Sequence, residues 1–265
     1  MFLIKYEGLG NTFLVAIEDQ IPPDGENLAA SVCDAVNGYD ADGLIFGTPS
    51  DSHDIDIQMT LYNADGGVAE ISGNGIRCLA QEIFSRSENL KSLEILTGSG
   101  VRSVTLENLD NHEAVISVDM GSVRDGPDLP LLDFLHHPSI DIIRAATADI
   151  GNPHVIVEVE DLDGVDVAGA GSHIEALWKP GGINVHFVKA ENSSKLSMLT
   201  WERGVGVTLA CGSGAAASAY IAHEWGLVGE TLDVVMSGGE TQIRLAKGKV
   251  YLTGKSSQVA EYEVP

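Results

Sequence analysis

An interval of about 140 residues recurs along this 265-residue chain and constrains its fold more than any other feature. The segment Ser72-Gly73-Asn74-Gly75 recurs in related form as Cys211-Gly212-Ser213-Gly214, and this repeat predicts two diverged halves. A pseudo-two-fold pair of this kind can place one acid/base group on each side of a small molecule, the geometry needed to invert a carbon stereocentre. The other landmarks, all repeating at spacings of 139 to 141 residues, are Gly10-Asn11 with Gly151-Asn152, Leu44-Ile45-Phe46 with Val185-His186-Phe187, and Asn63 with Glu202.

Apolar patterning in each half predicts many short strands and one long helix. Apolar residues at three- and four-residue spacing predict helices at about 74–87 and 212–225, and a shorter helix through Leu28, Val32 and Val36. Because the two long helices are nearly wholly apolar, we expect them to be buried. The sequence therefore predicts an α/β fold (α+β type) with two pseudo-symmetric domains, each a curved, mostly antiparallel sheet wrapped around a central helix. The expected strands cover 2–6, 13–17, 55–61, 93–97, 101–106, 114–118, 155–159, 183–188, 196–201, 232–236, 242–245 and 250–253.

Domain boundaries follow from the same interval. A chain of 265 residues suits one large domain or two small ones, and the repeat favours two. We expect an N-terminal half over residues 1–119 with a C-terminal segment of about 255–265, and a C-terminal half over residues 120–254. Residues 121–138 are the expected linker, because they include three prolines. The acidic run at 158–166 is expected at the surface.

Composition excludes several classes of partner and site. Lys and Arg total 15 against 39 Asp and Glu, a formal charge of −24, so nucleic acid and anionic membranes would be repelled. Three cysteines without a CxxC pair predict reduced thiols rather than a disulfide framework, and no array of ligands suggests a metal. Neither a leader-like start nor a long apolar run is present, so we expect a cytoplasmic protein without a membrane segment.

The two glycine-rich turns are the strongest candidates for ligand binding. Each precedes a predicted buried helix, where free backbone N–H groups and the helix dipole attract an anion. Two facing turns could hold one carboxylate. Glycines that only allow close packing or a positive φ angle are the alternative, and the matched positions of the turns favour the anion site.

Cys211 and Ser72 occupy the same place in the two turns. A thiol at a helix start is expected to have a lowered pKa, so that its thiolate serves as a base near neutral pH. The hydroxyl of Ser72 is a far weaker acid and could act as a proton donor only with help from a neighbour. Cys33 and Cys78 fall inside predicted helices and are interpreted as packing or surface thiols.

Further polar residues end apolar runs and could orient a ligand. His154 and Glu202 are candidates to orient or activate the two turns, although a buried histidine and a local ion pair are the simpler alternatives. Arg203 can bind a carboxylate through two parallel hydrogen bonds. Amides that could fix amino and carboxylate groups, or simply form turns, are Asn11, Asn63, Asn152 and Asn184.

Five motifs in order resemble the diaminopimelate epimerase family over nearly the whole chain. They are KYEGLGNTF at 5–13, NADGGVAEISGNGIRCLA at 63–80, GNPH at 151–154, INVHFV at 183–188 and WERGVGVTLACGSGAAASA at 201–219. The resemblance implies a cofactor-independent epimerase that interconverts LL- and meso-diaminopimelate, with two α/β halves, an active site in the cleft between them and a homodimeric assembly. Family members use two cysteines, one abstracting the α-proton and the other delivering a proton to the opposite face.

The resemblance also assigns roles by position. Cys211 would be one base, and Ser72 stands where the second cysteine is expected. His154 and Glu202 would support the bases. Backbone groups for the carboxylate at the reacting centre would come from Gly73, Asn74, Gly212 and Ser213, and the distal amino-acid end would be held by Asn11, Asn63, Asn152, Asn184 and Arg203.

Ser72 leaves the activity of the chain open. It is either an engineered replacement of cysteine or a natural residue that signals a one-base reaction. Loss of a general acid/base group costs about 10²–10⁴-fold in rate, so binding is expected to be stronger than turnover. Thr12, where the family usually has aspartate, is a lesser departure. The alternatives are an isomerase, dehydratase or racemase of this fold acting on another amino acid, and a catalytically silent amino-acid-binding protein.

Overall fold

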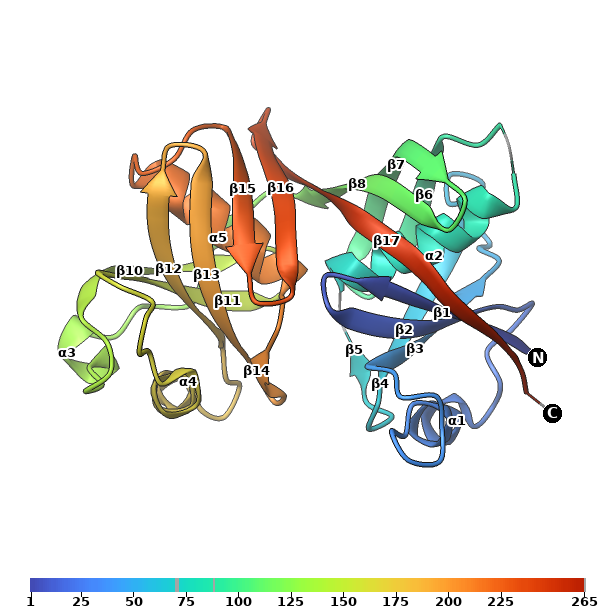
Figure 1. Ribbon diagram of the computed structural model, residues 1–265, viewed down its shortest axis with the longest axis horizontal. Helices are drawn as coiled ribbons and strands as arrows, with labels where there is room; N and C mark the ends of the chain where they lie inside the picture. Colours follow the sequence, from blue (N-terminus) through green and yellow to red (C-terminus); the bar gives the residue numbers. More distant parts are fainter. Residues whose placement is uncertain (70–71, 88, 265) are drawn as a thin grey trace. The chain divides into compact units, whose positions relative to one another are not determined.

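Two units make up the chain, and each has its own set of strands and its own central helix (Figure 1). The computed structural model describes residues 1–69, 72–87 and 89–264, so residues 70 and 71 of the 63–80 motif lie outside the described residues. The N-terminal unit comprises Met1–Asp119 and Thr253–Pro265, and the C-terminal unit comprises Met120–Leu252.

The N-terminal unit wraps its strands around helix α2. Strands β1 and β2 are antiparallel, β2 is parallel to β3, β3 is antiparallel to β4, and β4 is parallel to β6, which is antiparallel to β7. Helix α2 contacts β1, β2, β3, β4 and β7. The elements are β1 (Phe2–Gly8), β2 (Asn11–Ile17), α1 (Gly25–Val32), β3 (Gly43–Thr48), β4 (Ile57–Asn63), β5 (Val68–Ala69), α2 (Gly73–Ser85), β6 (Ser92–Thr97) and β7 (Gly100–Asp110), together with most of β8 (Glu113–Gly121) and of the long last strand β17 (Lys249–Glu263), which pairs with β1.

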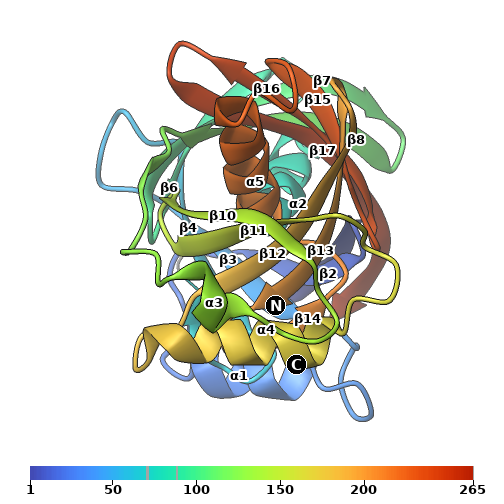
Figure 2. The same cartoon turned by 90° about the vertical axis from the view of Figure 1, so that its left-hand side faces the viewer.

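The C-terminal unit repeats this connectivity around helix α5. Strand β10 is antiparallel to β11, β11 is parallel to β12, β12 is antiparallel to β13, and β13 is parallel to β15, which is antiparallel to β16. Helix α5 contacts β10–β13, β15 and β16. In Figure 2 this unit is turned toward the viewer. The elements are β9 (Arg124–Asp125), α3 (Leu132–Leu135), β10 (Ile142–Asp149), β11 (Pro153–Val159), α4 (Val167–Glu175), η1 (Ala176–Trp178), β12 (Asn184–Asn192), β13 (Lys195–Glu202), β14 (Gly206–Thr208), α5 (Gly212–Glu224), β15 (Thr231–Met236) and β16 (Gly239–Ala246).

The repeat extends to the register of the strands. In the parallel pair β2–β3, Val15 lies opposite Ile45, and in β11–β12, Ile156 lies opposite His186. Both members of the second pair follow the first by 141 residues. Because a one-residue slip would send every side chain to the other face of the sheet, equal register means that matched positions face equivalent surroundings in the two units. The expected α/β fold is confirmed.

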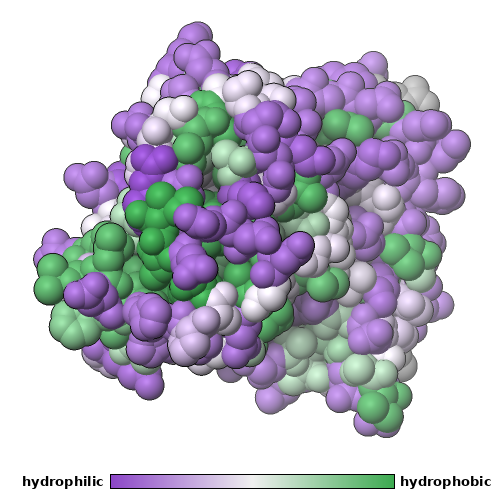
Figure 3. All heavy atoms as spheres, turned by 60° about the vertical axis from the view of Figure 1, so that its left-hand side comes forward, coloured by the Kyte–Doolittle hydropathy of each residue, from purple (hydrophilic) through white to green (hydrophobic). Residues whose placement is uncertain are grey.

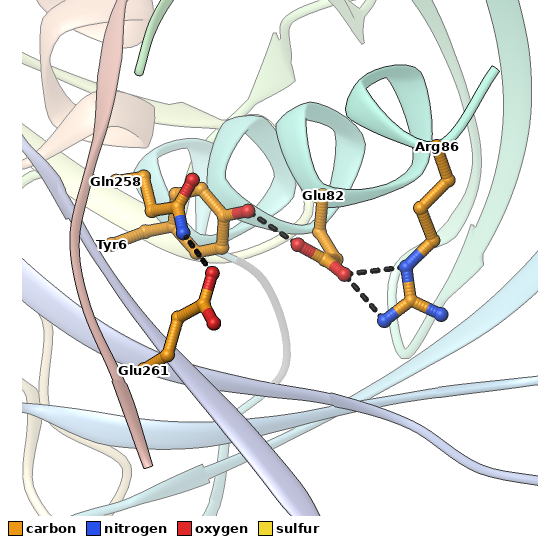
Figure 4. A network of polar contacts seen from close by, with 5 residues as sticks. All are labelled: Tyr6, Glu82, Arg86, Gln258 and Glu261. Carbon is orange, nitrogen blue, oxygen red and sulfur yellow. Dashed lines mark hydrogen bonds and ion pairs between the residues drawn. The ribbon is translucent and has the colours of Figure 1, made fainter. Parts of the chain in front are cut away.

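Helix α2 is tied to β1 by a buried polar network (Figure 4). The Tyr6 hydroxyl donates a hydrogen bond to the Glu82 carboxylate, which also forms an ion pair with Arg86 one turn further along the helix. Burial and the neighbouring Glu82 carboxylate raise the pKa of Tyr6, so its phenol stays protonated. Tyr6 is 1% and Glu82 3% exposed, so the carboxylate is buried against a neutral donor, whereas the side chain of its ion-pair partner Arg86 is 56% exposed.

Three local expectations are wrong. Helix α1 ends at Val32 and does not reach Val36, because the Asp34 carboxylate accepts hydrogen bonds from the next backbone N–H groups and forms a turn. The expected linker contains β9 and α3. Glu158, expected at the surface, is buried on β11 against Arg144.

Hydrophilic residues cover much of the face drawn in Figure 3, as the excess of carboxylates leads one to expect. Among residues 1–69, 72–87 and 89–264, no helix combines the length and apolar character needed to cross a membrane.

Candidate active site

The turns at Ser72 and Cys211 have the same backbone geometry. Ser72 is the N-cap of α2, with φ −142° and ψ 112°, and its hydroxyl accepts a hydrogen bond from Gly75 N at 3.0 Å. Cys211 is the N-cap of α5, with φ −136° and ψ 108°, and its sulfur accepts from Gly214 N at 3.4 Å. Serine is a common N-cap residue and cysteine is not, so the thiol at this place calls for a chemical explanation.

In the N-terminal unit, a buried arginine organises the Ser72 turn. Arg77 is fully buried and donates hydrogen bonds to Gly73 O at 3.3 Å and to Asn74 Oδ1 at 2.8 Å. Asn74 Nδ2 then donates to Asn11 Oδ1 at 2.7 Å. Burial lowers the pKa of Arg77 to about 10, which leaves it a cation at neutral pH. These hydrogen bonds connect three predicted positions, Gly73, Asn74 and Asn11, through Arg77, which the sequence pattern does not single out.

Asn63 lies at the end of β4 in the same unit and is half-buried. It lies opposite Gly43 in the β3–β4 ladder, and its backbone N–H and carbonyl close the turn to β5. Its matched position in the C-terminal unit is Glu202, at the end of β13. The two sites therefore share a place in the fold and differ in charge.

The Cys211 thiol has some neighbours that raise its pKa and others that lower it. It is 4% exposed, with Ser213 Oγ 3.6 Å from the sulfur and the Glu202 side chain in hydrogen-bonding contact. Burial first, and then the Glu202 charge, raise its pKa well above the ordinary value, while hydrogen bonds from Ser213 and Gly214 oppose this. The expectation of a lowered pKa at the helix start is therefore wrong for this structure: desolvation of the thiolate outweighs the helix terminus.

His154 and Asn152 belong to a buried hydrogen-bond network behind that thiol. His154 Nε2 lies 2.8 Å from Asn152 Oδ1, and His154 Nδ1 lies 2.8 Å from His186 Nε2. Asn152 Nδ2 lies 3.5 Å from Ser213 Oγ, which joins the network to the Cys211 turn. His186 was not singled out from the sequence, although it stands in the repeated segment that revealed the two halves.

Asn184 and Arg203 lie together at the start of β12 and the end of β13. Asn184 Nδ2 donates to Pro153 O at 2.9 Å, and Asn184 Oδ1 accepts from Arg203 N at 3.0 Å. These bonds fix the Asn184 amide. The Arg203 guanidinium donates to Gly181 O at 3.4 Å. The candidate residues of the C-terminal unit thus all fall at strand ends or at the helix start near Cys211. These eight residues are Asn152, His154, Asn184, Glu202, Arg203, Cys211, Gly212 and Ser213.

Solved structures with this fold include proteins named as epimerases, a probable proline racemase and phenazine biosynthesis proteins. A predicted epimerase from Pseudomonas aeruginosa superposes with a TM-score of 0.78 at 15% identity, covering 99% of this chain and 98% of that one. A hydroxyproline epimerase from Agrobacterium vitis gives a TM-score of 0.74 at 16% identity, covering 99% and 91%. At these identities the likeness establishes the fold.

Fold and sequence relatives together define the chain as an isomerase of the amino-acid epimerase and racemase class. The family model described as diaminopimelate epimerase matches residues 3–125 and 146–259. The chain belongs to this family. Diaminopimelate epimerases from Methanothermobacter thermautotrophicus and Methanocaldococcus jannaschii are 36% and 30% identical to it, covering 90% and 98% of this chain and 88% and 97% of the relatives.

Proposed function

We propose that the chain interconverts LL- and meso-diaminopimelate without a cofactor, by proton transfer at the α-carbon, with Cys211 as one of two acid/base groups. The observation that carries the proposal is the Cys211 turn: a buried thiol contacts the Glu202 carboxylate at the start of a helix. The carboxylate is placed to accept the thiol proton, and because burial and the Glu202 charge raise the pKa of Cys211, the thiolate is a strong base for a carbon acid once it forms.

The carboxylate of the substrate fits the same turn. Gly212 and Ser213 begin α5, where backbone N–H groups have no partner within the helix and the dipole favours a negative charge. Gly73 and Asn74 begin α2 in the same way. The N–H groups that hold the carboxylate would also stabilise the negative charge that spreads from the α-carbon onto that carboxylate when the proton leaves.

Recognition of the distal amino-acid end is proposed for the amides and the guanidinium. Asn11, Asn63, Asn152 and Asn184 supply amide groups, and Arg203 supplies a cation that matches a carboxylate. The fixed amides of Asn11 and Asn184 support this role, because one hydrogen bond of the Asn11 side chain and two of the Asn184 side chain set their orientations. A homodimer in the cytoplasm, expected from the family resemblance, also stays a prediction, and sedimentation velocity would measure the assembly.

Ser72 is proposed to limit turnover. The hydroxyl has the geometry of the Cys211 sulfur at the other turn but lacks its acidity. Replacing the hydroxyl by a thiol in Ser72→Cys is expected to raise epimerisation by about 10²–10⁴-fold, the size of one general acid/base contribution.

Exchange of the α-hydrogen in heavy water tests the proposal. The chain, Ser72→Cys and Cys211→Ser are each incubated with LL-diaminopimelate, and deuterium at the α-carbon and the LL to meso ratio are followed by NMR. We expect Ser72→Cys to exchange and epimerise fastest and Cys211→Ser to do neither. Unchanged exchange in Cys211→Ser would overturn the role of the thiol. Equal epimerisation by the chain and Ser72→Cys would overturn the account of the hydroxyl, and proline serves as the control substrate.

A further inference from the structure

Two buried histidines lie side by side behind the Cys211 turn. His154 on β11 and His186 on β12 are both 0% exposed, and their rings lie 5.1 Å apart between centroids. Burial lowers the pKa of both, that of His154 to about 3, so both imidazoles are neutral at neutral pH. Each ring therefore carries a single N–H, and the place of that proton fixes the direction of every hydrogen bond in the network.

The donor direction of these hydrogen bonds follows from His186, the member of the network farthest along it from Cys211. His186 Nδ1 is buried without a hydrogen-bond partner among the described residues, and an orphaned buried N–H is rare in proteins. His186 therefore carries its proton on Nε2 and donates to His154 Nδ1 at 2.8 Å. His154 must then carry its own proton on Nε2, from which it donates to Asn152 Oδ1, also at 2.8 Å.

The same direction continues to the sulfur. With Asn152 Oδ1 occupied as an acceptor, Asn152 Nδ2 is directed toward Ser213 Oγ, 3.5 Å away. The Ser213 hydroxyl is then free to donate its proton to Cys211 Sγ, 3.6 Å away, beside the N–H of Gly214. The sulfur thus receives two donors from this side. The charged groups that face the relay are Glu202, which contacts the thiol, and Arg203, whose charge acts on His154.

Packing alone does not require these imidazoles. The matched residues in the N-terminal unit are Phe13 and Ile45, which are 5% and 0% exposed at the same register of the parallel pair β2–β3. Ile45 Cδ1 packs 3.1 Å from a Cβ added at Gly75, as the His186 ring packs against Gly214. The fold is therefore satisfied by an apolar pair, and the polar pair at this place belongs to the half that bears the thiol.

We propose that His186 is a positioning residue for Cys211: it fixes the donor direction of the relay His186–His154–Asn152–Ser213 so that the relay ends on the sulfur and stabilises the thiolate. The proposal deepens the function proposed above and rests on it for its catalytic meaning. Its physical content, which nitrogen carries each proton and how readily the thiol ionises, is independent of turnover.

The first test compares three variants at His186 and one control. His186→Ile copies the residue of the other half and removes the donor, His186→Gln keeps a side-chain N–H donor, and His223→Phe removes a half-buried histidine on α5 outside the relay. Thiolate absorbance of Cys211 is titrated with pH, taken as the difference from the same protein with Cys211→Ser. A neutral hydrogen bond corresponds to about a three- to five-fold change in the thiolate population.

We expect His186→Ile to lower the thiolate fraction of Cys211 by about three- to five-fold below the midpoint of the titration. His186→Gln and His223→Phe are expected to titrate like the parent chain. A titration of His186→Ile equal to that of the parent, or one of His186→Gln equal to that of His186→Ile, would overturn the relay.

The second test needs no substitution. Long-range ¹H–¹⁵N NMR spectra of the intact chain identify the protonated nitrogen of each imidazole, and we expect Nε2–H in both His154 and His186. An Nδ1–H tautomer of His154 would overturn the direction of the relay whatever the variants do. Failure of the deuterium exchange in heavy water, with both of these results as expected, would instead overturn the proposed function and leave the relay standing.

Discussion

Gly214→Ala offers the sharpest test of how closely the Cys211 turn packs on His186. A Cβ added at Gly214 would lie 2.2 Å from His186 Cε1 and 2.5 Å from its Nε2. Carbon atoms attract at about 3.5–4.0 Å, so the ring or the helix start must shift by about an ångström. The matched glycine in the other unit is Gly75, where an added Cβ would meet the flexible ends of Ile45 and Met59 at 3.1 and 3.2 Å.

The two substitutions are therefore expected to differ in their effect on the free energy of unfolding. Overpacking a rigid buried site costs about 1–3 kcal/mol, whereas replacing glycine by alanine in a helix gains up to about 1 kcal/mol. For Gly214→Ala we take the upper end of the cost, because the aromatic ring cannot bend away, and expect a net loss of about 2 kcal/mol. For Gly75→Ala the flexible neighbours adjust, and we expect a change near zero.

Hydrogen exchange measured by mass spectrometry reports the free energy of opening for each unit separately. The three tryptophans, Trp178, Trp201 and Trp225, all lie in the C-terminal unit and give a second, unit-specific signal in urea. In a double-mutant cycle, His186→Ala should relieve most of the cost of Gly214→Ala, a coupling of about 2 kcal/mol. Equal effects of Gly214→Ala and Gly75→Ala, or no coupling to His186, would refute the reasoning.

Three further outcomes follow from buried groups. Because burial lowers the pKa of His154 to about 3, its contribution to stability is present above about pH 6.5 and is lost as the pH falls toward 3, by about 1.4 kcal/mol per pH unit. Burial also lowers the pKa of His186, so tryptophan fluorescence should show the C-terminal unit unfolding in acid with a pH dependence that His186→Ile weakens. Tyr6→Phe removes the buried donor to the core carboxylate and should cost the N-terminal unit about 1–3 kcal/mol, measured by exchange of the α2 amides. Glu202→Gln removes a charge that raises the pKa of Cys211, so the thiolate midpoint should move to lower pH while α-hydrogen exchange declines.

The sequence predicted the features that depend on local pattern. Helices α2 and α5 follow from apolar residues at three- and four-residue spacing behind a glycine-rich turn, and β4 follows from strict alternation. Strand β10 was missed because its residues are mostly half-buried and show no clean alternation. Helix α4 was missed because its sequence, VAGAGSHIE, has few large apolar residues and two glycines.

The parts of the site that sequence could not supply depend on contacts between distant residues. Arg77 reads as an ordinary surface cation on a helix until the fold buries it against Asn74. The direction of the Cys211 pKa shift was wrong because a helix start suggests a stabilised thiolate, whereas burial is a property of the whole unit. The role of Arg77 and the direction of the Cys211 pKa shift both depend on burial in the folded unit, which no local sequence pattern reports.

Comparison of the halves separates what the fold needs from what the chemistry needs. The same arrangement of two parallel strands places Phe13 and Ile45 in the first half and His154 and His186 in the second, at equal register. Since the apolar pair satisfies the packing, the buried polar pair must be maintained against a desolvation cost for another reason. The difference falls in the half where the helix cap is a thiol, and the imidazoles connect to that cap through hydrogen bonds. The apolar pair of the first half is thus the control for the second, and replacing His186 by its apolar counterpart should alter proton transfer at Cys211 more than it alters stability at neutral pH.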